Sequence, residues 1–314
     1  MKFRREARGL HFYDRSSGLH VLLDECPIPW EYVDEGPAVI SIALTNACDL
    51  SCAFCYAPKS NHWLRSDDVI RWCRELEELG TLEVAFGGGE PTLYRDLPQL
   101  CRTLWSETNL GISITTHGQQ LTDELVNSVQ GAVSIIRVSI DGPEPYYSSI
   151  RGDRLQPLIE RLDRVGGRLP LGINTVINPD TLPHLDETAA LVRGVGAVDW
   201  LLLPEVRSGE FILSNSEWRV LDKWIAERRF DIELRVATEA AKYLTCPLLL
   251  DDPPESYAHI SADGHLRRCS YSTGGIRLEG MSMTAALRGL KQQSSLALLK
   301  QGGSLLNAPI PPDA

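Results

Sequence analysis

The stretch AVISIALTNACDLSCAFCY (38–56) joins a short apolar run to three closely spaced cysteines. Its first part, 38–46, is rich in β-branched residues, which is typical of a buried strand. Five further runs of this kind follow, and after each run come apolar residues at helical spacing. The predicted strands are 38–46, 83–88, 111–118, 134–141, 171–178 and 198–206, and the predicted helices are 66–79, 95–107, 122–130, 154–165, 181–194 and 214–228.

This alternation predicts an α/β fold with a parallel sheet. Strands that read as nearly continuous apolar runs are buried on both faces, as they are in parallel sheets covered by helices. Right-handed crossovers then wind the strands in one direction. Six such units form either a doubly wound sheet or an open part of a (β/α) barrel, and in both folds the ligand site lies at the carboxyl ends of the strands.

Three segments lie outside the alternation. Residues 9–25 predict a β-hairpin, 231–272 predict a strand and a second hairpin turning at Asp263-Gly264, and 283–300 predict a final helix. We therefore divide the chain into an N-terminal hairpin extension (1–37), a core (38–230) and a small C-terminal α+β cap (231–314).

Composition limits the class of protein. The chain has 314 residues and a net charge of −11, which disfavours a nucleic-acid partner. We expect no membrane partner, because no apolar run reaches the roughly 18 residues of a span. The N-terminus has no apolar region of a secretory signal, which predicts a cytoplasmic protein. Thiols stay reduced there, so clustered cysteines indicate metal binding or catalysis.

Cys48, Cys52 and Cys55 are open to three interpretations. At spacings of four and three residues they form a helical stripe, and buried free cysteines often belong to a core. With His62 they supply the four ligands of a structural zinc site. A [4Fe–4S] cluster also has four corners, so three thiolates leave one iron open, as a catalytic cluster requires.

The pattern C-x3-C-x2-C after the first strand, with Phe54 before the last cysteine, resembles the radical S-adenosylmethionine (radical SAM) superfamily. The resemblance implies a partial (β/α)6 TIM-type barrel. It also implies that Cys48, Cys52 and Cys55 hold a [4Fe–4S] cluster. The amino and carboxylate groups of S-adenosylmethionine (SAM) would then bind the fourth iron.

The glycine-rich stretch FGGGEP (86–91) follows the second predicted strand. A phosphate loop is disfavoured, because no Lys-Ser or Lys-Thr pair follows the glycines. Glycine allows a ligand to approach the backbone closely, and a carboxylate accepts hydrogen bonds from an ammonium group. The stretch is similar to the GGE motif of the same family, which implies that Gly88, Gly89 and Glu90 bind the SAM amino group.

Two later strand ends also carry polar residues. Ser139-Ile-Asp-Gly-Pro and the following Arg151-Gly152 resemble the SxDGP…RG pattern of the peptide-modifying branch. The resemblance implies that Ser139 and Arg151 approach the SAM carboxylate and ribose. A surface position for Arg151 and simple turn chemistry for Asp141 stay open. Asn174, on the fifth strand, either contacts the ribose or makes a structural hydrogen bond.

Two further residues lie at the ends of predicted strands. His117 stands where relatives often carry asparagine, and we expect it to fill the turn after the third strand. Glu205 ends the sixth strand and faces either substrate or solvent.

The remaining cysteines predict no second cluster. Cys246 and Cys269 resemble the opening of a SPASM or Twitch domain, but no cysteine follows Cys269. Two thiolates cannot complete a four-ligand cluster, and Cys26 joins them only if the N-terminal hairpin folds across. We therefore expect a shortened cap without an auxiliary cluster. Cys73 and Cys101 lie on the apolar faces of predicted helices and belong to the core.

The resemblance implies reductive cleavage of SAM to a 5′-deoxyadenosyl radical that takes a hydrogen atom from a substrate. The SxDGP…RG pattern favours a peptide substrate, as in the maturation of a ribosomal peptide, and a small metabolite is the alternative. SAM reduction needs a low potential, so a flavodoxin- or ferredoxin-type electron donor is implied. The rival from another class is a zinc-stabilised binding protein using Cys48, Cys52, Cys55 and His62.

Overall fold

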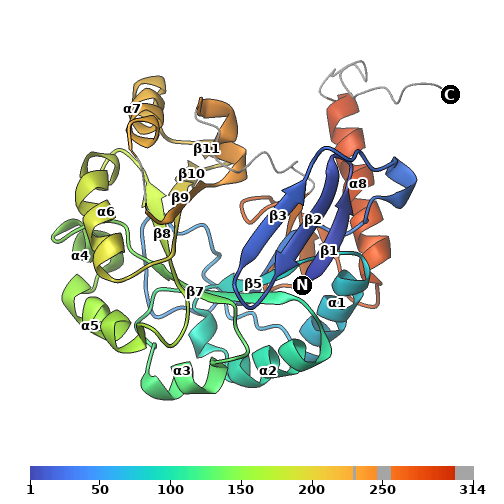
Figure 1. Cartoon of the computed structure of the whole chain (residues 1–314), viewed down its shortest axis with the longest axis horizontal. Coiled ribbons are helices and arrows are strands. Elements are labelled where there is room, and N and C mark those ends of the chain that lie inside the picture. Colours follow the sequence, from blue (N-terminus) through green and yellow to red (C-terminus); the bar gives the residue numbers. More distant parts are fainter. Residues whose placement is uncertain (229–230, 246–255, 301–314) are drawn as a thin grey trace.

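The computed structural model describes residues 1–228, 231–245 and 256–300. One large sheet forms its centre (Figure 1). Its strands are β4 (Val39–Thr45), β5 (Glu83–Gly88), β6 (Gly111–Thr116), β7 (Ile135–Ser139), β8 (Leu171–Ile177), β9 (Asp199–Pro204), β12 (Glu233–Val236), β13 (Tyr257–Ile260), β14 (His265–Arg267) and β15 (Ile276–Arg277).

The strand order is β12-β9-β8-β7-β6-β5-β4-β13-β14-β15, and the strands from β12 to β13 are parallel. The six predicted strand–helix units are all present, so the predicted α/β fold is confirmed. Among the described residues β12 and β15 lie at opposite edges and do not pair, so the sheet is a partial barrel rather than a closed one.

The helices follow the outer side of the curved sheet in Figure 1. They are α1 (Ser66–Glu78), α2 (Leu97–Glu107), α3 (Asp123–Val129), α4 (Tyr146–Arg151), α5 (Leu155–Val165), α6 (Leu185–Gly194), α7 (Asn215–Ala226) and α8 (Met283–Lys300). The buried stripe of α1 is Val69, Trp72, Cys73 and Leu76, the periodicity of a helix packed on one face. Cys73 and Cys101 are fully buried, as predicted for core residues. No helix within the described ranges is both long and apolar enough to cross a membrane.

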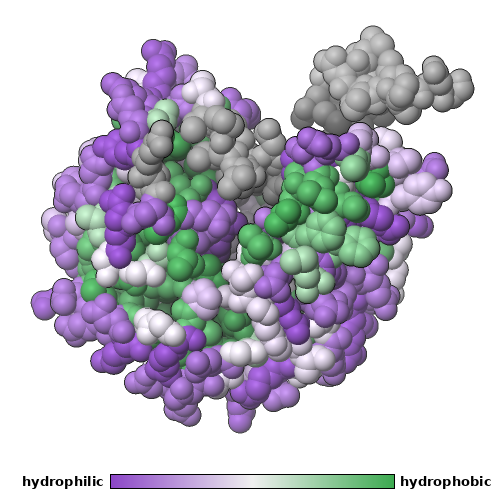
Figure 2. All heavy atoms as spheres, viewed as in Figure 1, coloured by the Kyte–Doolittle hydropathy of each residue, from purple (hydrophilic) through white to green (hydrophobic). Residues whose placement is uncertain are grey.

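The N-terminal extension has one strand more than the predicted hairpin. β1 (Lys2–Glu6), β2 (Gly9–Asp14) and β3 (Leu19–Leu23) form an antiparallel sheet. β1 was not predicted because its sequence, KFRRE, is mostly charged. The charged residues Arg4 and Glu6 nevertheless lie on the buried face of the sheet. Apolar side chains gather instead on its outer face, which Figure 2 shows as a green area over these strands.

This small sheet covers the end of the barrel where the strands begin. The hydroxyl of Tyr13 donates a hydrogen bond to the carboxylate of Glu83, the first residue of β5, at 3.0 Å. The guanidinium of Arg4 donates to the carbonyls of Gly36 and Gly80, at 2.9 and 3.3 Å. The carboxyl ends of the strands, where ligands bind in such folds, lie at the opposite end.

The C-terminal segment continues the central sheet. β13 pairs in parallel with β4, and the predicted hairpin turns at Asp263-Gly264 between β13 and β14. α8 confirms the predicted final helix. A short hairpin, β10 (Val206–Arg207) with β11 (Glu210–Phe211), follows β9 and was not predicted. The proposed domain boundaries stay predictions.

Candidate active site

The cysteine loop, residues 46–63, connects β4 to α1 at the carboxyl end of the sheet. Its two ends are tied together, because the N–H of Asn46 donates to the carbonyl of His62 at 3.0 Å and the N–H of Leu64 donates to that of Leu44 at 3.0 Å. The loop contains no helix, so the interpretation of the cysteines as a helical core stripe is wrong. All three of its thiols are partly exposed.

The surroundings of the thiols suit thiolates that serve as metal ligands. Burial raises the pKa of both Cys48 and Cys52 above the usual value of a thiol. The N–H of Leu50 points at the Cys48 sulfur at 3.4 Å, and a guanidinium nitrogen of Arg151 at the Cys52 sulfur at 3.8 Å. A metal favours the thiolate form and offsets the cost of ionising a buried thiol. Three sulfur donors on one loop therefore fit an iron–sulfur cluster.

The zinc alternative finds no support in this geometry. Tetrahedral zinc holds its ligands at about 2.0–2.3 Å, so the four donor atoms must lie close together. Among the described residues, the possible ligands within 4.8 Å of one another are Cys48, Asp49 and His117. His62 instead makes a 2.8 Å hydrogen bond from Nδ1 to the hydroxyl of Ser60.

The glycine-rich motif packs against the start of the cysteine loop. Gly88 has a φ of +118°, and a Cβ there would lie 2.3 Å from the carbonyl oxygen of Thr45. A Cβ on Gly89 would lie 2.1 Å from the carbonyl oxygen of Ala47. Only glycine allows this approach. By contrast, a Cβ on Gly87, which was not predicted, would meet no atom within 4 Å, so its outer side is open.

Glu90 is occupied by protein donors. It is 1% exposed, and its Oε1 accepts hydrogen bonds from the N–H and hydroxyl of Thr92, at 3.0 and 2.6 Å, and from the hydroxyl of Thr116, at 2.6 Å. Its Oε2 accepts from the N–H of His117 at 3.0 Å. The carboxylate therefore fixes the strand ends of β5 and β6 to each other.

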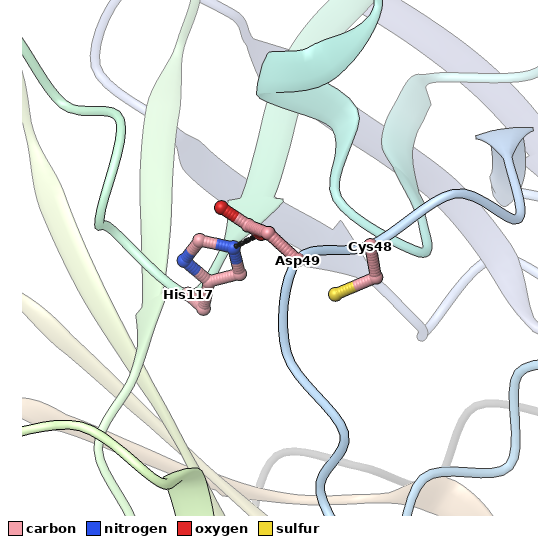
Figure 3. A group of neighbouring side chains, drawn as sticks. All are labelled: Cys48, Asp49 and His117. Carbon is pink, nitrogen blue, oxygen red and sulfur yellow. Dashed lines mark hydrogen bonds and ion pairs between the residues drawn. The ribbon is translucent and has the colours of Figure 1, made fainter.

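His117 does more than fill a turn. Its ring is buried, and Nε2 lies 2.6 Å from Asp49 Oδ1 and 3.2 Å from Glu90 Oε2. Figure 3 shows the ring directed at Asp49, beside the thiol of Cys48. Burial alone would raise the pKa of Asp49, but the His117 and Gln120 donors hold that pKa below its ordinary value. No sequence signal other than the departure from asparagine marks this position.

Arg151 is held by a buried carboxylate. Its Nε donates to Asp141 Oδ2 at 2.6 Å, and Asp141 Oδ1 accepts from the N–H of Val176 at 2.9 Å. The guanidinium also lies over the ring of Phe54, 5.2 Å from its centre. Asp141 is therefore more than turn chemistry, and Arg151 is buried rather than a surface residue. The pair places a positive charge beside Cys52.

Two buried polar atoms near these residues have no protein partner. Asn174 Oδ1 and the hydroxyl of Tyr147 make no hydrogen bond within the described part of the chain. Asn174 is paired with Ser139, the last residue of β7, so both lie level with the carboxyl end of that strand. Unpartnered buried polar groups are costly unless a ligand satisfies them. The site therefore fits a polar cofactor such as SAM, and the structural role of Asn174 is not supported.

Comparison with known proteins agrees with this arrangement. The sequence model of the Radical SAM superfamily matches residues 42–192, which include the cysteine loop and the strand ends described above. This chain belongs to the radical SAM superfamily. It is therefore an enzyme of the radical SAM class, and its cofactors are a [4Fe–4S] cluster and SAM.

Relatives with an assigned activity include GTP 3′,8-cyclases. The chain is 26% identical over 253 residues to a probable GTP 3′,8-cyclase of Sulfurisphaera tokodaii, covering 74% of this chain and 80% of the relative. It is 28% identical over 167 residues to a GTP 3′,8-cyclase of Actinobacillus pleuropneumoniae, covering 49% of each chain. These matches support the superfamily and leave the substrate to be argued separately.

Solved radical SAM structures share the fold. Streptococcus suis SuiB bound to the precursor peptide SuiA has a TM-score of 0.71 at 14% identity, covering 91% of this chain and 86% of SuiB. The enzyme anSMEcpe with bound AdoMet has a TM-score of 0.59 at 16% identity, covering 82% of each chain. At these identities the likeness concerns the fold alone.

A cavity of about 270 Å³ lies between the radical SAM cysteine loop, Gly88 and the β13–β14 hairpin. Within the described residues, its lining includes one arginine, Arg267, which pairs with the carboxylate of Asp263 at 3.3 Å. His259 also lines it, with Nδ1 2.6 Å from the hydroxyl of Ser41. Burial lowers the pKa of His259 to about 4. The cavity therefore carries little net charge from Arg267, Asp263 and His259.

The remaining predicted residues are Cys26, Cys246, Cys269 and Glu205. The segment that holds Cys269 lies beside the cysteine loop, because the ring of Tyr271 packs 5.0 Å from that of Tyr56. Cys269 contacts the hydroxyl of Ser272 at 3.1 Å, and Cys26 is exposed. Cys246 lies outside the described residues, so the absence of an auxiliary cluster stays a prediction. Glu205 faces neither solvent nor an open site, because it is buried and accepts from Asn178 at 2.9 Å and Arg207 at 2.6 Å.

Proposed function

We propose that Cys48, Cys52 and Cys55 hold three irons of the cluster and that SAM binds the fourth. The observation that carries this proposal is the position of the three partly exposed thiols on one loop, at the carboxyl end of β4 and against the glycine-rich motif. When bound and reduced, the cluster would supply the electron that breaks a carbon–sulfur bond of SAM, and this cleavage would permit removal of a hydrogen atom from an unactivated carbon.

The residues around the loop would bind and orient SAM. The backbone at Gly88 and Gly89 would approach the SAM amino group, while the side chain of Glu90 keeps these strand ends in place, since protein donors already engage it. Asn174 offers an unpartnered oxygen to a ribose hydroxyl, and Ser139 lies beside it.

Two residues border the loop from the α4 side. Arg151, fixed by Asp141, places its guanidinium beside Cys52, where it would also attract a carboxylate. Phe54 stacks against that guanidinium and shields the loop from water. Arg151 would therefore help to hold the carboxylate group of SAM beside the cysteine loop.

For the substrate, a peptide is the better candidate. The SxDGP…RG pattern and the fold shared with SuiB, whose structure holds a precursor peptide, both support it. The cavity beside the cysteine loop adds a physical reason, because its arginine is already paired with Asp263. Amide groups of a peptide would find hydrogen-bond partners there, whereas a triphosphate would need unpaired cations.

The second candidate is a small metabolite, supported by the names of the GTP 3′,8-cyclase relatives. The two candidate substrates differ in how GTP should affect SAM consumption. A nucleoside triphosphate substrate predicts that GTP raises SAM consumption by the reduced enzyme above its basal rate. The peptide proposal predicts no response to GTP.

The cluster must also receive electrons from outside the chain. A flavodoxin- or ferredoxin-type donor in the cytoplasm would supply the low potential that SAM reduction needs. The experiment that tests the proposed function is anaerobic reconstitution with iron and sulfide, followed by reduction in the presence of SAM. We expect about four irons per chain and formation of 5′-deoxyadenosine. A colourless, zinc-containing protein that leaves SAM intact would contradict the proposal.

A further inference from the structure

We propose that His117 is a positioning residue that joins the cysteine loop to the glycine-rich motif through a ring of fixed tautomer. The proposal rests on the function proposed above for the cysteine loop. Its basis is one buried imidazole that reaches two carboxylates from different elements: Asp49, adjacent to Cys48 in the loop, and Glu90, after β5. Figure 3 shows how close the ring lies to the Cys48 side chain.

The hydrogen bonds of the ring assign its tautomer. The N–H of Gln119 donates to His117 Nδ1 at 3.1 Å, so Nδ1 carries a lone pair and the proton is on Nε2. That Nε2–H donates to Asp49 at 2.6 Å and lies 3.2 Å from Glu90. The backbone thus dictates which carboxylates the ring can bind.

The same geometry argues against His117 as a metal ligand. Its Nε2 lies within 4.8 Å of the Cys48 thiol and Asp49, a group that by distance alone suits one metal ion. A metal-bound imidazole usually donates its other N–H to an acceptor. Here the N–H of Gln119 faces Nδ1, so a proton on Nδ1 would meet another donor. Holding the loop is the role that these contacts permit.

Asp49 connects His117 to the part of the loop that carries Cys48. Asp49 is also held by the side-chain amide of Gln120, at 3.3 Å to its second oxygen. The loop start is further tied to the motif by the N–H of Glu90, which donates to the carbonyl of Ala47 at 2.8 Å. Cys48 lies between these two fixed neighbours, because Ala47 is tied to Glu90 after β5 and Asp49 is tied to His117 after β6. Of its contacts to His117 and Gln120, loss of His117 would leave Asp49 with only the one to Gln120.

The test uses reconstituted full-length enzyme and measures how fast a chelator, bathophenanthroline, removes iron under anaerobic conditions. For His117→Phe we expect release about 10-fold faster or more, since residues that orient metal ligands typically affect affinity by 10–100-fold. His117→Asn retains an N–H donor for Asp49 and should restore most of the slow release. Asp49→Ala should match His117→Phe, and the double variant should be no faster than either single variant.

A matched control separates this role from general stability. His265→Phe removes another histidine–aspartate pair, His265 with Asp263 at 3.3 Å, in the β13–β14 hairpin, and should leave iron release unchanged. Release from His117→Phe at the wild-type rate, or additive effects of the two single variants, would overturn the inference. Wild-type protein that binds no cluster would instead overturn the proposed function, so the two failures are distinguishable.

Discussion

Near the start of β9, the buried carboxylate of Asp199 lies between the guanidinium groups of Arg137 and Arg235. At the opposite end of the sheet, Asn174 Oδ1 and the hydroxyl of Tyr147 are buried without a partner among the described residues. The buried charge of Asp199 at the first end is therefore paired within the protein. The second end leaves two buried polar atoms for a ligand, at a cost to stability.

This difference assigns separate roles to the two ends. In barrels of this kind, polar groups at the beginning of the strands serve stability and those at the carboxyl ends serve binding and chemistry. Substitutions at the first end should therefore lower the free energy of unfolding and spare SAM cleavage. Substitutions at the carboxyl ends should impair SAM binding or cleavage and leave the free energy of unfolding unchanged or higher.

The largest expected effect is at the cysteine loop. Replacing Cys48, Cys52 or Cys55 singly by alanine removes one ligand of the proposed cluster, so 5′-deoxyadenosine formation should fall below detection. Iron content and product are measured after anaerobic reconstitution. Cys101→Ala, in the core, serves as the control and should keep full cofactor cleavage in the folded protein. Undiminished product in any loop variant would refute the assignment of that thiol.

The next effect concerns the first end of the sheet. Asp199→Asn removes the counter-ion of Arg137 and leaves Arg235 with the longer pair to Glu233 at 3.8 Å, and breaking such buried pairs typically costs about 3 kcal/mol or more. Urea denaturation should show this loss, with SAM cleavage per folded molecule unchanged. Asp186→Asn is the matched control, because its partner Arg228 forms an exposed pair worth less than about 1 kcal/mol. Impaired SAM cleavage in the folded Asp199→Asn variant would contradict the assignment of a purely structural role to this end of the sheet.

His259 predicts a dependence of stability on pH. The folded protein keeps this ring neutral down to a pKa of about 4, whereas the unfolded chain protonates near 6.5. Between these values the unfolded state binds more protons, so the free energy of unfolding falls as the pH is lowered from about 6.5 to 4. The loss attributable to His259 is about 3 kcal/mol in total.

The measurement compares wild type with His259→Leu by urea denaturation at several pH values from 8 to 4. The carboxylates common to both proteins cancel in the difference. The wild-type curve should be steeper in this interval and parallel to the variant above pH 7. Identical slopes would show that the folded protein protonates His259 as readily as the unfolded chain.

The smallest expected change is at Asn174. Asn174→Leu removes an unpartnered buried oxygen, so the free energy of unfolding should stay the same or rise by about 1 kcal/mol. The affinity for SAM should fall by about 10-fold, the equivalent of one lost hydrogen bond to the cofactor. Equilibrium binding of SAM to the reconstituted protein measures this. Strong destabilisation with unchanged SAM binding would reassign Asn174 to a structural role.

The strands of the core could be predicted because parallel strands are buried on both faces. Their apolar runs, as in 38–46 and 171–178, need no partner information to be recognised. The cysteine loop was recognisable by spacing alone. β1 was missed because Arg4 and Glu6 face inward, contrary to the usual pattern. The helix α4 was missed because it has only six residues, which is too short for a recognisable helical periodicity.

Contacts between distant residues could not be predicted. Asp49 and His117 are separated by 68 positions and become partners only when the strand ends meet. The engagement of Glu90 by Thr116 and His117 has the same origin. Asp141 and Arg151, 10 positions apart, are brought together by the turn and α4 that follow β7. A sequence motif therefore identifies the kind of chemistry, while the role of each residue within the motif depends on its contacts in the folded sheet.

The central claim is that the three loop thiols leave one iron open for SAM. The most direct measurement is the electron paramagnetic resonance spectrum of the anaerobically reconstituted, dithionite-reduced protein, recorded before and after addition of SAM. We expect the signal of a reduced [4Fe–4S] cluster whose g-values shift when SAM binds. A protein with no such signal, or with a signal that SAM leaves unchanged, would contradict the account.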